Sequence, residues 1–484
     1  MWEQIEPTPA HLTYLFLSAF LISYCLFASF IRNRLHLSEP PVALLIGILL
    51  GPRVIGLLNP NSCSGHGCHD GIGSTRRVEG WEWGDDVVQE ATRVILGIQV
   101  FTIGVELPKY YAARHWKSVA MMLGPIMTFG WLVTAGFAML LFKTSFPTAL
   151  IIGACLTPTD PVLASSILSN SQFSNRVPKR IKDMLSAESG CNDGTSFPFL
   201  YIGLYALIHP KTQLAVRDYF LITILWQCTF GILLGLLIGT AFNRILKFCD
   251  KRHYIDPAGF IVFYLLMALL CVGIGSTLGL DDFLTHSTHL PNVVDLLLNS
   301  AMFVYFGAII PWRSFSPQSI TPLLTAGRIF GFVVLVLLFR RIPIVLALYR
   351  WIPDIRTFQE ALFCGHFGPM GLGALFLAIE ARAMLETETS LPLPHPPIHG
   401  PPWSPREVAI EMVWPVVSAV VVASTMVHGL SVLALSMGSH FSRKEGERAP
   451  LLAGETDPLG GMEHEGGGGD SEPSSEEEED ANTY

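Results

Sequence analysis

The stretch Leu156-Thr-Pro-Thr-Asp-Pro161 decides the fold, because it interrupts an apolar run near the depth where a membrane helix would be centred. Its two prolines each remove a backbone N–H donor and leave nearby carbonyl groups without helical partners. Asp160 lies between them. Unwound backbone and a carboxylate are tolerated at membrane depth where they line a cavity. The stretch therefore predicts a broken transmembrane helix around a polar site.

A second polar cluster, Glu188-Ser-Gly-Cys-Asn-Asp-Gly194, lies near the start of the next apolar segment. On a helix, Glu188 and Asn192 are four residues apart, as are Ser189 and Asp193, so each pair shares a face. Oxygen atoms that suit a hard cation thus gather on adjacent segments. The alternative is that the two aspartates only cap helix ends or pair with arginines.

The two clusters together predict a site where a proton and a cation compete. Asp160, Asp193, Thr159 and Ser189 would present an oxygen shell to one alkali cation, with water completing it. The same carboxylates would accept protons, and competition for one site produces exchange without further machinery.

The composition indicates a polytopic membrane protein. Half of the 484 residues are apolar, 15% are charged and the mean hydropathy is +0.44, whereas soluble domains carry about a quarter charged residues. A bilayer core needs roughly 20 apolar residues per helix. Twelve segments meet this requirement, approximately 11–31, 40–58, 86–106, 115–142, 147–169, 184–208, 218–247, 257–280, 295–310, 319–339, 357–380 and 408–438.

Domain boundaries follow from the same pattern. We expect residues 1–438 to form one transmembrane domain. Residues 439–484 are rich in Gly, Glu, Ser and Pro, so they predict a disordered acidic tail. Glu106 and Glu380 fall near segment ends, and we expect both at the membrane interface.

Loop charges predict the orientation, because Lys and Arg in short loops stay on the cytoplasmic side. The loops after the first, third, fifth and seventh segments are the most basic, which places the N-terminus outside. The alternation then fails at Arg340, Arg341, Arg350 and Arg356, which follow the tenth segment. An additional or re-entrant segment between about 281 and 295 would restore it, giving thirteen crossings in effect and a cytoplasmic tail.

Two of the nine cysteines stand apart from the apolar segments. Cys63 and Cys68 lie in a Gly-rich loop that the charge pattern places outside, where a disulfide would persist. A metal site formed by these cysteines and the neighbouring histidines is the alternative.

The motifs resemble those of the fungal sodium/proton antiporters of the cation/proton antiporter family, also called monovalent cation:proton antiporter 1. The similarity covers most of residues 10–440. It rests on RVILGIQVFTIGVELPKYY (93–111), ACLTPTDPVLASSI (154–167), AESGCNDGTSFPFLYIGL (187–204), DLLLNSAMFVYFGAIIPW (295–312), LLFRRIP (337–343) and GHFGPMGLGALF (365–376). The resemblance implies an all-α inverted-repeat fold with about 12–13 transmembrane helices and two crossed, partly unwound helices. It also implies a core domain moving against a dimerisation domain, and homodimers in the plasma membrane.

The same resemblance assigns roles to individual residues. It implies coordination of the transported metal ion by Asp160 and Asp193, with oxygens from Thr159 and Ser189. The cargo would be Na⁺, or Li⁺ or K⁺, and H⁺, with no further cofactor and no nucleic-acid partner.

Other residues match supporting positions of the family. Glu188 and Asn192 support the site, and Arg328 matches an arginine that stabilises the core and could pair with Glu188. The alternative is that Arg328 snorkels to the membrane surface. Asp281 and Asp282 match an acidic pair that influences transport, although roughly one helix present in relatives is missing after them.

We therefore expect a secondary active transporter, not an enzyme, that exchanges sodium for protons by alternating access and serves salt tolerance and pH homeostasis. The alternatives are a different cation transporter and a truncated, non-functional antiporter. An intramembrane aspartyl protease would need a GxGD motif, whereas Asp160 follows a threonine. A channel or receptor would lack proton coupling.

Overall fold

The computed structural model describes most of the chain, and every regular element in the described part is a helix. The described residues are 9–34, 38–58, 84–108, 110–161, 163–164, 177–280, 292–315, 324–393 and 403–442. The expectations for Cys63, Cys68, Asp281, Asp282 and the acidic tail beyond residue 442 therefore lie outside the described residues.

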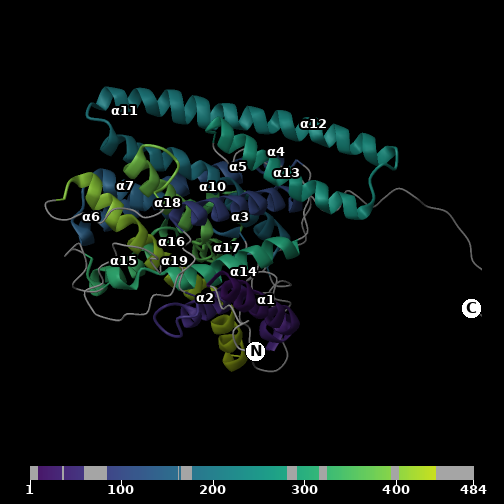
Figure 1. Ribbon diagram of the computed structural model, residues 1–484, viewed down its shortest axis with the longest axis horizontal. Helices are drawn as coiled ribbons and strands as arrows, with labels where there is room; N and C mark the ends of the chain where they lie inside the picture. The colour runs from purple at the N-terminus through teal and green to yellow at the C-terminus, as the bar shows by residue number, and fades with distance from the viewer. Residues whose placement is uncertain are drawn as a thin grey trace, which may run out of the picture. The chain divides into compact units, whose positions relative to one another are not determined.

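The helices follow the predicted apolar segments (Figure 1). The first half contains α1 (Pro9–Arg34), α2 (Glu39–Leu50), α3 (Asp85–Glu106), α4 (Tyr111–Arg114), α5 (Trp116–Met121), the π-helix η2 (Met122–Ile126), α6 (Met127–Phe142), α7 (Phe146–Cys155) and α10 (Lys179–Ile208). The second half contains α11 (Thr212–Asp218), η3 (Tyr219–Phe230), α12 (Gly231–Lys251), α13 (Pro257–Leu278), α14 (Asn292–Ile309), η4 (Trp312–Phe315), α15 (Ala326–Phe339), α16 (Ile342–Leu348), η5 (Tyr349–Trp351), α17 (Phe358–His366), α18 (Leu372–Thr387) and α19 (Pro405–Ser442). Each of the twelve segments overlaps a helix or a run of helices, so the all-α class is confirmed.

Several of these helices are long and apolar enough to cross a bilayer. Within the described residues four stretches meet that criterion, namely Trp116–Phe142, Thr212–Lys251, Ala326–Trp351 and Pro405–Ser431. Shorter apolar helices cover Leu15–Phe27, Glu39–Leu50, Phe146–Cys155, Val262–Leu278 and Leu297–Ile309.

The stretch from α11 through α12 presents an apolar surface outward. Figure 1 shows it as one long run of helix, and only 17% of its most apolar window is buried. Leu236 and Leu237 are 68% and 66% exposed. A continuous apolar face of this kind is unfavourable in water and matches lipid tails.

Small residues allow α2 and α14 to pack closely. A Cβ added at Gly307 would lie 2.6 Å from the Leu44 carbonyl oxygen and 2.7 Å from the Ile48 nitrogen. A Cβ at Gly47 would overlap the Val304 carbonyl oxygen. In a bilayer, where burial of apolar groups gives little driving force between helices, such close van der Waals packing holds them together.

Two helix breaks meet in the centre of the described structure. Residues 157–160 continue from α7 without helical structure, and residues 367–371 separate α17 from α18. The backbone N–H of Asp160 donates to the Pro369 carbonyl oxygen at 2.7 Å, so the breaks touch directly. The broken helix expected at Pro158 and Pro161 is present, and it crosses a second broken helix.

The structure corrects the loop-charge argument at the α15–α16 junction. Arg340 and Arg341 are 7% and 6% exposed, so they are core residues rather than members of a solvated basic loop. The orientation rule concerns charges in water, and buried arginines give it no information. Only Arg350 and Arg356 of that group remain as loop charges.

Candidate functional site

Side chains replace the helical hydrogen bonds that the prolines remove. The Thr157 hydroxyl donates to the Ala154 carbonyl oxygen at 2.7 Å and also lies 2.9 Å from the Ser196 hydroxyl. Thr157 and Ser196 are buried, at 5% and 0% exposure. These bonds fix the direction in which the chain leaves α7, and so they position the residues that follow.

A hydrogen-bonded group joins the first break to α10. The Asn192 side chain accepts from the Thr159 backbone N–H at 3.2 Å and donates to the Thr159 hydroxyl at 2.7 Å. That hydroxyl also lies 2.9 Å from the Ser189 hydroxyl. Asn192 therefore orients Thr159, and the two hydroxyl oxygens lie side by side.

The Asp160 carboxylate is held by backbone donors from two helix starts. Its Oδ1 accepts from the Leu163 N–H at 2.8 Å, and its Oδ2 accepts from the Leu372 N–H at 3.2 Å. The second donor belongs to the first turn of α18, where the helix dipole favours a negative charge. Asp160 thus acts as a cap for both broken helices, which agrees in part with the capping alternative considered from the sequence.

Asp193 is buried as deeply as Asp160 but accepts fewer hydrogen bonds among the described residues. It is 3% exposed, and within the described residues its Oδ2 has no hydrogen-bond partner. It lies close enough to Asp160 for the two carboxylates to interact electrostatically. Gly373, at the start of α18, faces it so closely that a Cβ there would overlap Oδ1. Buried polar atoms are nearly always satisfied, so a proton, a water molecule or a cation would complete this site.

Glu188 forms a buried ion pair with Arg341. Both terminal nitrogens of the Arg341 guanidinium, Nη1 and Nη2, donate to the carboxylate, and the Nη2 contact to Oε2 is 2.7 Å. The third nitrogen, Nε, donates to the Cys364 carbonyl oxygen at 2.8 Å. The expected pairing of Glu188 with Arg328 is therefore wrong. Arg328 lies in the first turn of α15, half-buried, and the arginine pair at the end of that helix supplies the partner instead.

Arg340 is a site residue that sequence reasoning missed. Its guanidinium donates to the carbonyl oxygens of Leu156, at the end of α7 beside the first break, at 2.5 Å and of Gly368, in the second break, at 2.7 Å. One cation therefore satisfies backbone oxygens of both unwound segments. The signal in the sequence was the pair of arginines inside the apolar run LLFRRIP, which has no acidic neighbour to suggest a surface ion pair.

A small cavity adjoins the crossing on the side of η2 and α6. Its volume is about 20 Å³, which is room for roughly one water molecule. It is lined by Ile126, Met127, Gly130, Thr157, Glu188, Asn192, Arg340 and Arg341. Polar groups that hold the breaks therefore lie within reach of water.

The structure brings most, but not all, of the predicted residues together. Thr159, Asp160, Ser189, Asn192 and Asp193 come together at the crossing, with Glu188 behind it. Arg328 is not part of this group, and Asp281 and Asp282 lie outside the described residues. Glu380, expected at the interface, is 2% exposed and buried among helices.

Broken helices that cross at a buried carboxylate, with backbone and hydroxyl oxygens beside it, are the architecture of secondary transporters. The transmembrane profile of the sodium/hydrogen exchanger family matches residues 16–438. The chain belongs to the sodium/hydrogen exchanger family.

Individual relatives agree with this assignment. A probable Na⁺/H⁺ antiporter of Schizosaccharomyces pombe is 40% identical over 460 residues, which is 91% of this chain and 58% of that protein. Na⁺/H⁺ antiporter 2 of Zygosaccharomyces rouxii is 38% identical over 464 residues, 91% of this chain and 54% of that protein. The chain thus spans about half the length of these relatives.

A solved structure shows the same fold at low identity. The sodium proton antiporter MjNhaP1 of Methanocaldococcus jannaschii, determined at pH 8, aligns with a TM-score of 0.56 and 16% identity. The alignment covers 90% of this chain and 98% of that one. The inverted-repeat antiporter fold expected from the motifs is confirmed.

Proposed function

We propose that this chain exchanges sodium, or a similar alkali cation, for protons by alternating access, and that Asp193 binds the cation and the proton in turn. The observation that carries the proposal is the buried Oδ2 of Asp193 at the crossing of two broken helices, which has no hydrogen-bond partner in the part of the chain that the structure describes. A carboxylate that binds a cation and then a proton needs an oxygen atom that does not already accept a hydrogen bond from the protein. Family membership supports the same reaction.

The remaining residues of the crossing have supporting roles in this proposal. The hydroxyl oxygens of Thr159 and Ser189 contribute to the cation's shell, and Asn192 keeps Thr159 in place. Asp160 contributes negative charge while its two oxygens hold the helix starts. Oxygen ligands of this kind suit Na⁺ and also Li⁺ or K⁺.

We propose further that the chain works as a homodimer in the plasma membrane with its tail in the cytoplasm. The resemblance to fungal antiporters and the basic loops near the start of α10 support this arrangement. Thirteen effective crossings would place the tail inside.

A test is proton movement in proteoliposomes that contain a pH-sensitive dye. Sodium, lithium or potassium added to wild-type vesicles should dissipate a preformed pH gradient, and Asp193→Asn should abolish the effect. Asp256→Asn is the matched control, since Asp256 is an exposed N-cap of α13 and asparagine caps equally well. Cation flux without proton movement would indicate a channel and would contradict antiport.

The same assay tests whether the chain is a shortened, inactive form. If the wild type moves no protons while a version with the family's additional helix inserted after Asp282 does, the truncated alternative is correct. If neither version moves protons in response to any of the three cations, the transport proposal is wrong.

A further inference from the structure

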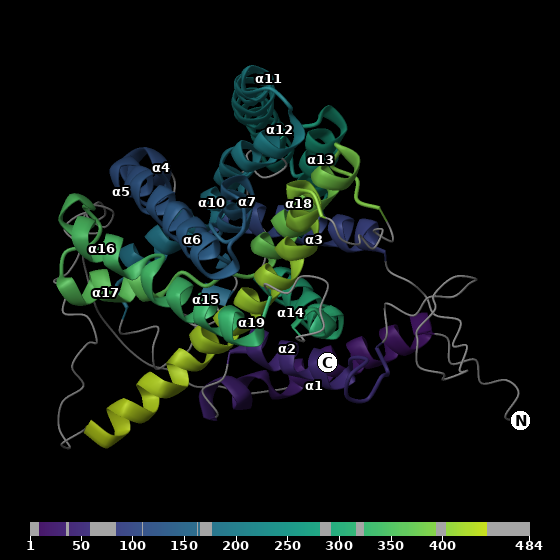
Figure 2. The same ribbon diagram turned by 90° about the vertical axis from the view of Figure 1, so that its left-hand side faces the viewer.

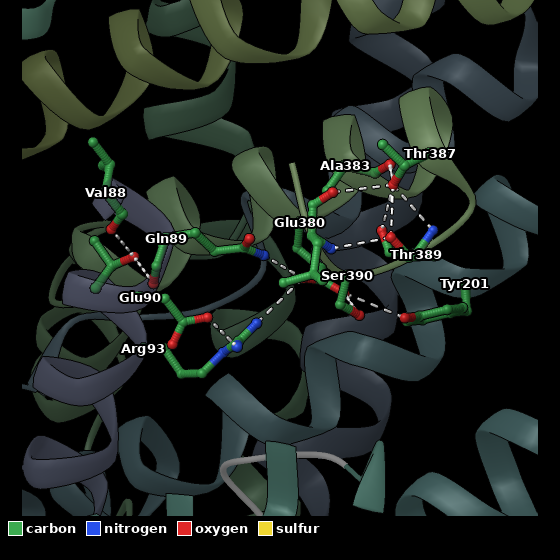
Figure 3. A network of polar contacts seen from close by, with 12 residues as sticks. Val88, Gln89, Glu90, Arg93, Tyr201, Glu380, Ala383, Thr387, Thr389 and Ser390 are labelled. Atoms are coloured by element: carbon green, nitrogen blue, oxygen red, sulfur yellow. Dashed lines mark hydrogen bonds and ion pairs between the residues drawn. The ribbon is translucent and has the colours of Figure 1, made fainter. Parts of the chain in front are cut away.

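Glu380 is a second buried carboxylate, separate from the crossing, and the proposed exchange does not use it. Its Oε2 accepts from the Gln89 side-chain amide at 2.5 Å, and its Oε1 accepts from the Ser390 hydroxyl at 2.7 Å (Figure 3). The Tyr201 hydroxyl is 3.4 Å from Oε1, and the Arg93 guanidinium is 4.0 Å from Oε2. These partners come from α3, α10 and the segment after α18.

Glu380 and these four partners, here called the Glu380 network, lie at similar distances from the ion site along α18 and along α10. On α18, Glu380 is seven residues beyond Gly373, which is two helical turns, about 10 Å, on the same face. On α10, Tyr201 is eight residues beyond Asp193, about 12 Å along the axis. Because Gly373 faces Asp193 and Tyr201 faces Glu380, both helices run from the site to the network in the same direction.

Helix α3 packs beside the stretch from Asp193 to Glu380, here called the route, and runs antiparallel to α10 and α18. A Cβ at Gly190, beside the site on α10, would meet the Ile103 side chain near the end of α3. Gln89, near the start of α3, meets Glu380. Figure 2 shows α3 next to α18, and the two helices are in contact.

An aromatic layer separates the ion site from the Glu380 network. Phe197 of α10 and Phe376 of α18 have ring centroids 6.2 Å apart and are 6% and 1% exposed. Phe197 lies between Asp193 and Tyr201 along α10, and Phe376 lies between Gly373 and Glu380 along α18. The Arg93 guanidinium lies over the Phe376 ring, 5.6 Å from its centroid, on the side of the network. Two buried aromatic rings therefore lie at the levels of α10 and α18 between Asp193 and Glu380.

An ion pair also joins α3 and α18, farther from Asp193 than the Glu380 network. The Arg382 guanidinium is 2.9 Å from the Asp85 carboxylate and 3.5 Å from the carboxylate of Glu386 on its own helix. The contacts that α18 makes with its neighbours therefore become more polar with distance from Asp193, from an aromatic layer with α10 to buried hydrogen bonds and then to ion pairs with α3.

We propose that the Phe197–Phe376 layer and the Glu380 network form the closed outer gate of the ion pathway, and that Glu380 is the residue that holds α18 against α3. This inference rests on the proposed function, because a gate requires alternating access. The loop charges place the start of α10 inside, so the Tyr201 end of the route is the outer end. Opening exchanges the donors of Glu380 for water, a change with a small net free energy, whereas an apolar residue there would have to expose its surface to water.

The test measures accessibility from the outside rather than transport. Leu377→Cys provides the reporter, since Leu377 is 1% exposed and lies between Gly373 and Glu380 on α18. The background has its nine native cysteines replaced by serine or alanine. A membrane-impermeant methanethiosulfonate reagent is added outside intact vesicles, and the rate of labelling is compared among variants.

Glu380→Gln should raise the outside labelling rate about tenfold, because charge-assisted hydrogen bonds that favour the closed gate are lost. Ser390→Ala removes one donor from a partly buried position and should raise it several-fold without a threat to folding. Glu388→Gln is the matched control, since the Glu388 side chain is 59% exposed and pairs with Arg406 at the surface. It should leave the rate unchanged.

The gate is contradicted if the reporter reacts equally fast in the parent and in both gate variants, or if only labelling from the inside increases. Failure of the proposed function is distinguishable, because labelling does not need transport. If the wild type moves no protons in proteoliposomes while Glu380→Gln still raises labelling from the outside, the proposed gate is supported and the proposed cation/proton exchange is contradicted.

Discussion

At the residue scale, the two aspartates of the crossing have different surroundings. Both oxygens of Asp160 accept backbone N–H groups from helix starts. Asp193 Oδ2 has no such donor among the described residues. A carboxylate that holds backbone together contributes to stability, and one that lacks donors is available for a ligand. Similar motif positions in the sequence therefore correspond to different tasks.

This difference predicts opposite effects of two amide substitutions on stability. Asp160→Asn replaces one acceptor oxygen by an NH₂ group that faces a backbone N–H, which costs roughly 1–3 kcal/mol. Asp193→Asn removes a buried charge and should leave the melting temperature of the purified protein unchanged or higher. Equal losses of melting temperature in the two variants would show that Asp193 is also committed to the fold.

The buried ion pair predicts a second effect at this scale. Glu188→Ala leaves the Arg341 guanidinium buried without its carboxylate, which typically costs about 3–5 kcal/mol. The exposed pair of Arg406 and Glu388 is the control, and Glu388→Ala should cost about 0–1 kcal/mol. Thermal unfolding in detergent measures both. Similar small shifts would mean that Arg341 finds other partners when Glu188 is removed.

At the element scale, the start of α18 forms one wall of the site. A Cβ at Gly371 would overlap the Asp160 carboxylate, and one at Gly373 would overlap that of Asp193. The helix can approach both aspartates only because these positions have no side chain. The second helix break thus needs glycine for space, in addition to any need for backbone freedom.

Gly373→Ala should therefore abolish cation-dependent proton movement while the protein still folds as helix. The added methyl group would overlap Oδ1 and so displace the Asp193 carboxylate, whose Oδ2 binds the cation in the proposed function. Gly136→Ala in α6 is the control, since no atom of the described residues lies within 4 Å of its new Cβ, and it should be neutral or stabilising by about 0.5–1 kcal/mol. Normal exchange by Gly373→Ala would place the cation elsewhere.

Arg340 is the element-scale connection between the breaks. Its planar guanidinium donates to the Leu156 and Gly368 carbonyl oxygens at once, which the single ammonium group of lysine cannot do in the same geometry. Arg340→Lys should lower both melting temperature and exchange rate. The conservative change Arg350→Lys, at an exposed position in the same region, should affect neither. An unaltered melting temperature for Arg340→Lys would contradict the bridging role.

The sequence predicted the helices well because their signal is local. Prolines within an apolar run located the first break, and spacing within a helix placed Ser189 and Asp193 on one face. The partners of Glu188, Arg340 and Glu380 could not be predicted in this way. Most of these contacts join residues more than a hundred positions apart, as Glu188 and Arg341 do, and local patterns contain no information about such pairs.

At the scale of the whole molecule, the described chain buries clusters of charged and polar groups within a largely apolar interior and also exposes apolar side chains on its outside. Buried charges gather at the crossing and around Glu380, whereas α12 exposes leucines to the surroundings. Buried charges within the core and apolar side chains on the outside suit a transporter that shields ions from lipid. The proposed gate and the ion site both lie on α10 and α18. Motion of α18 relative to α3 would therefore link access from outside to ion binding.

The central claim is that a cation and a proton compete for Asp193, and proton release on cation binding tests it most directly. Sodium chloride would be added to purified protein in weakly buffered detergent solution near neutral pH, with choline chloride as the salt control, and released protons measured. Wild type should release protons as sodium saturates the site, and Asp193→Asn should release none. Sodium binding without proton release, or equal release by the variant, would contradict a shared site at Asp193.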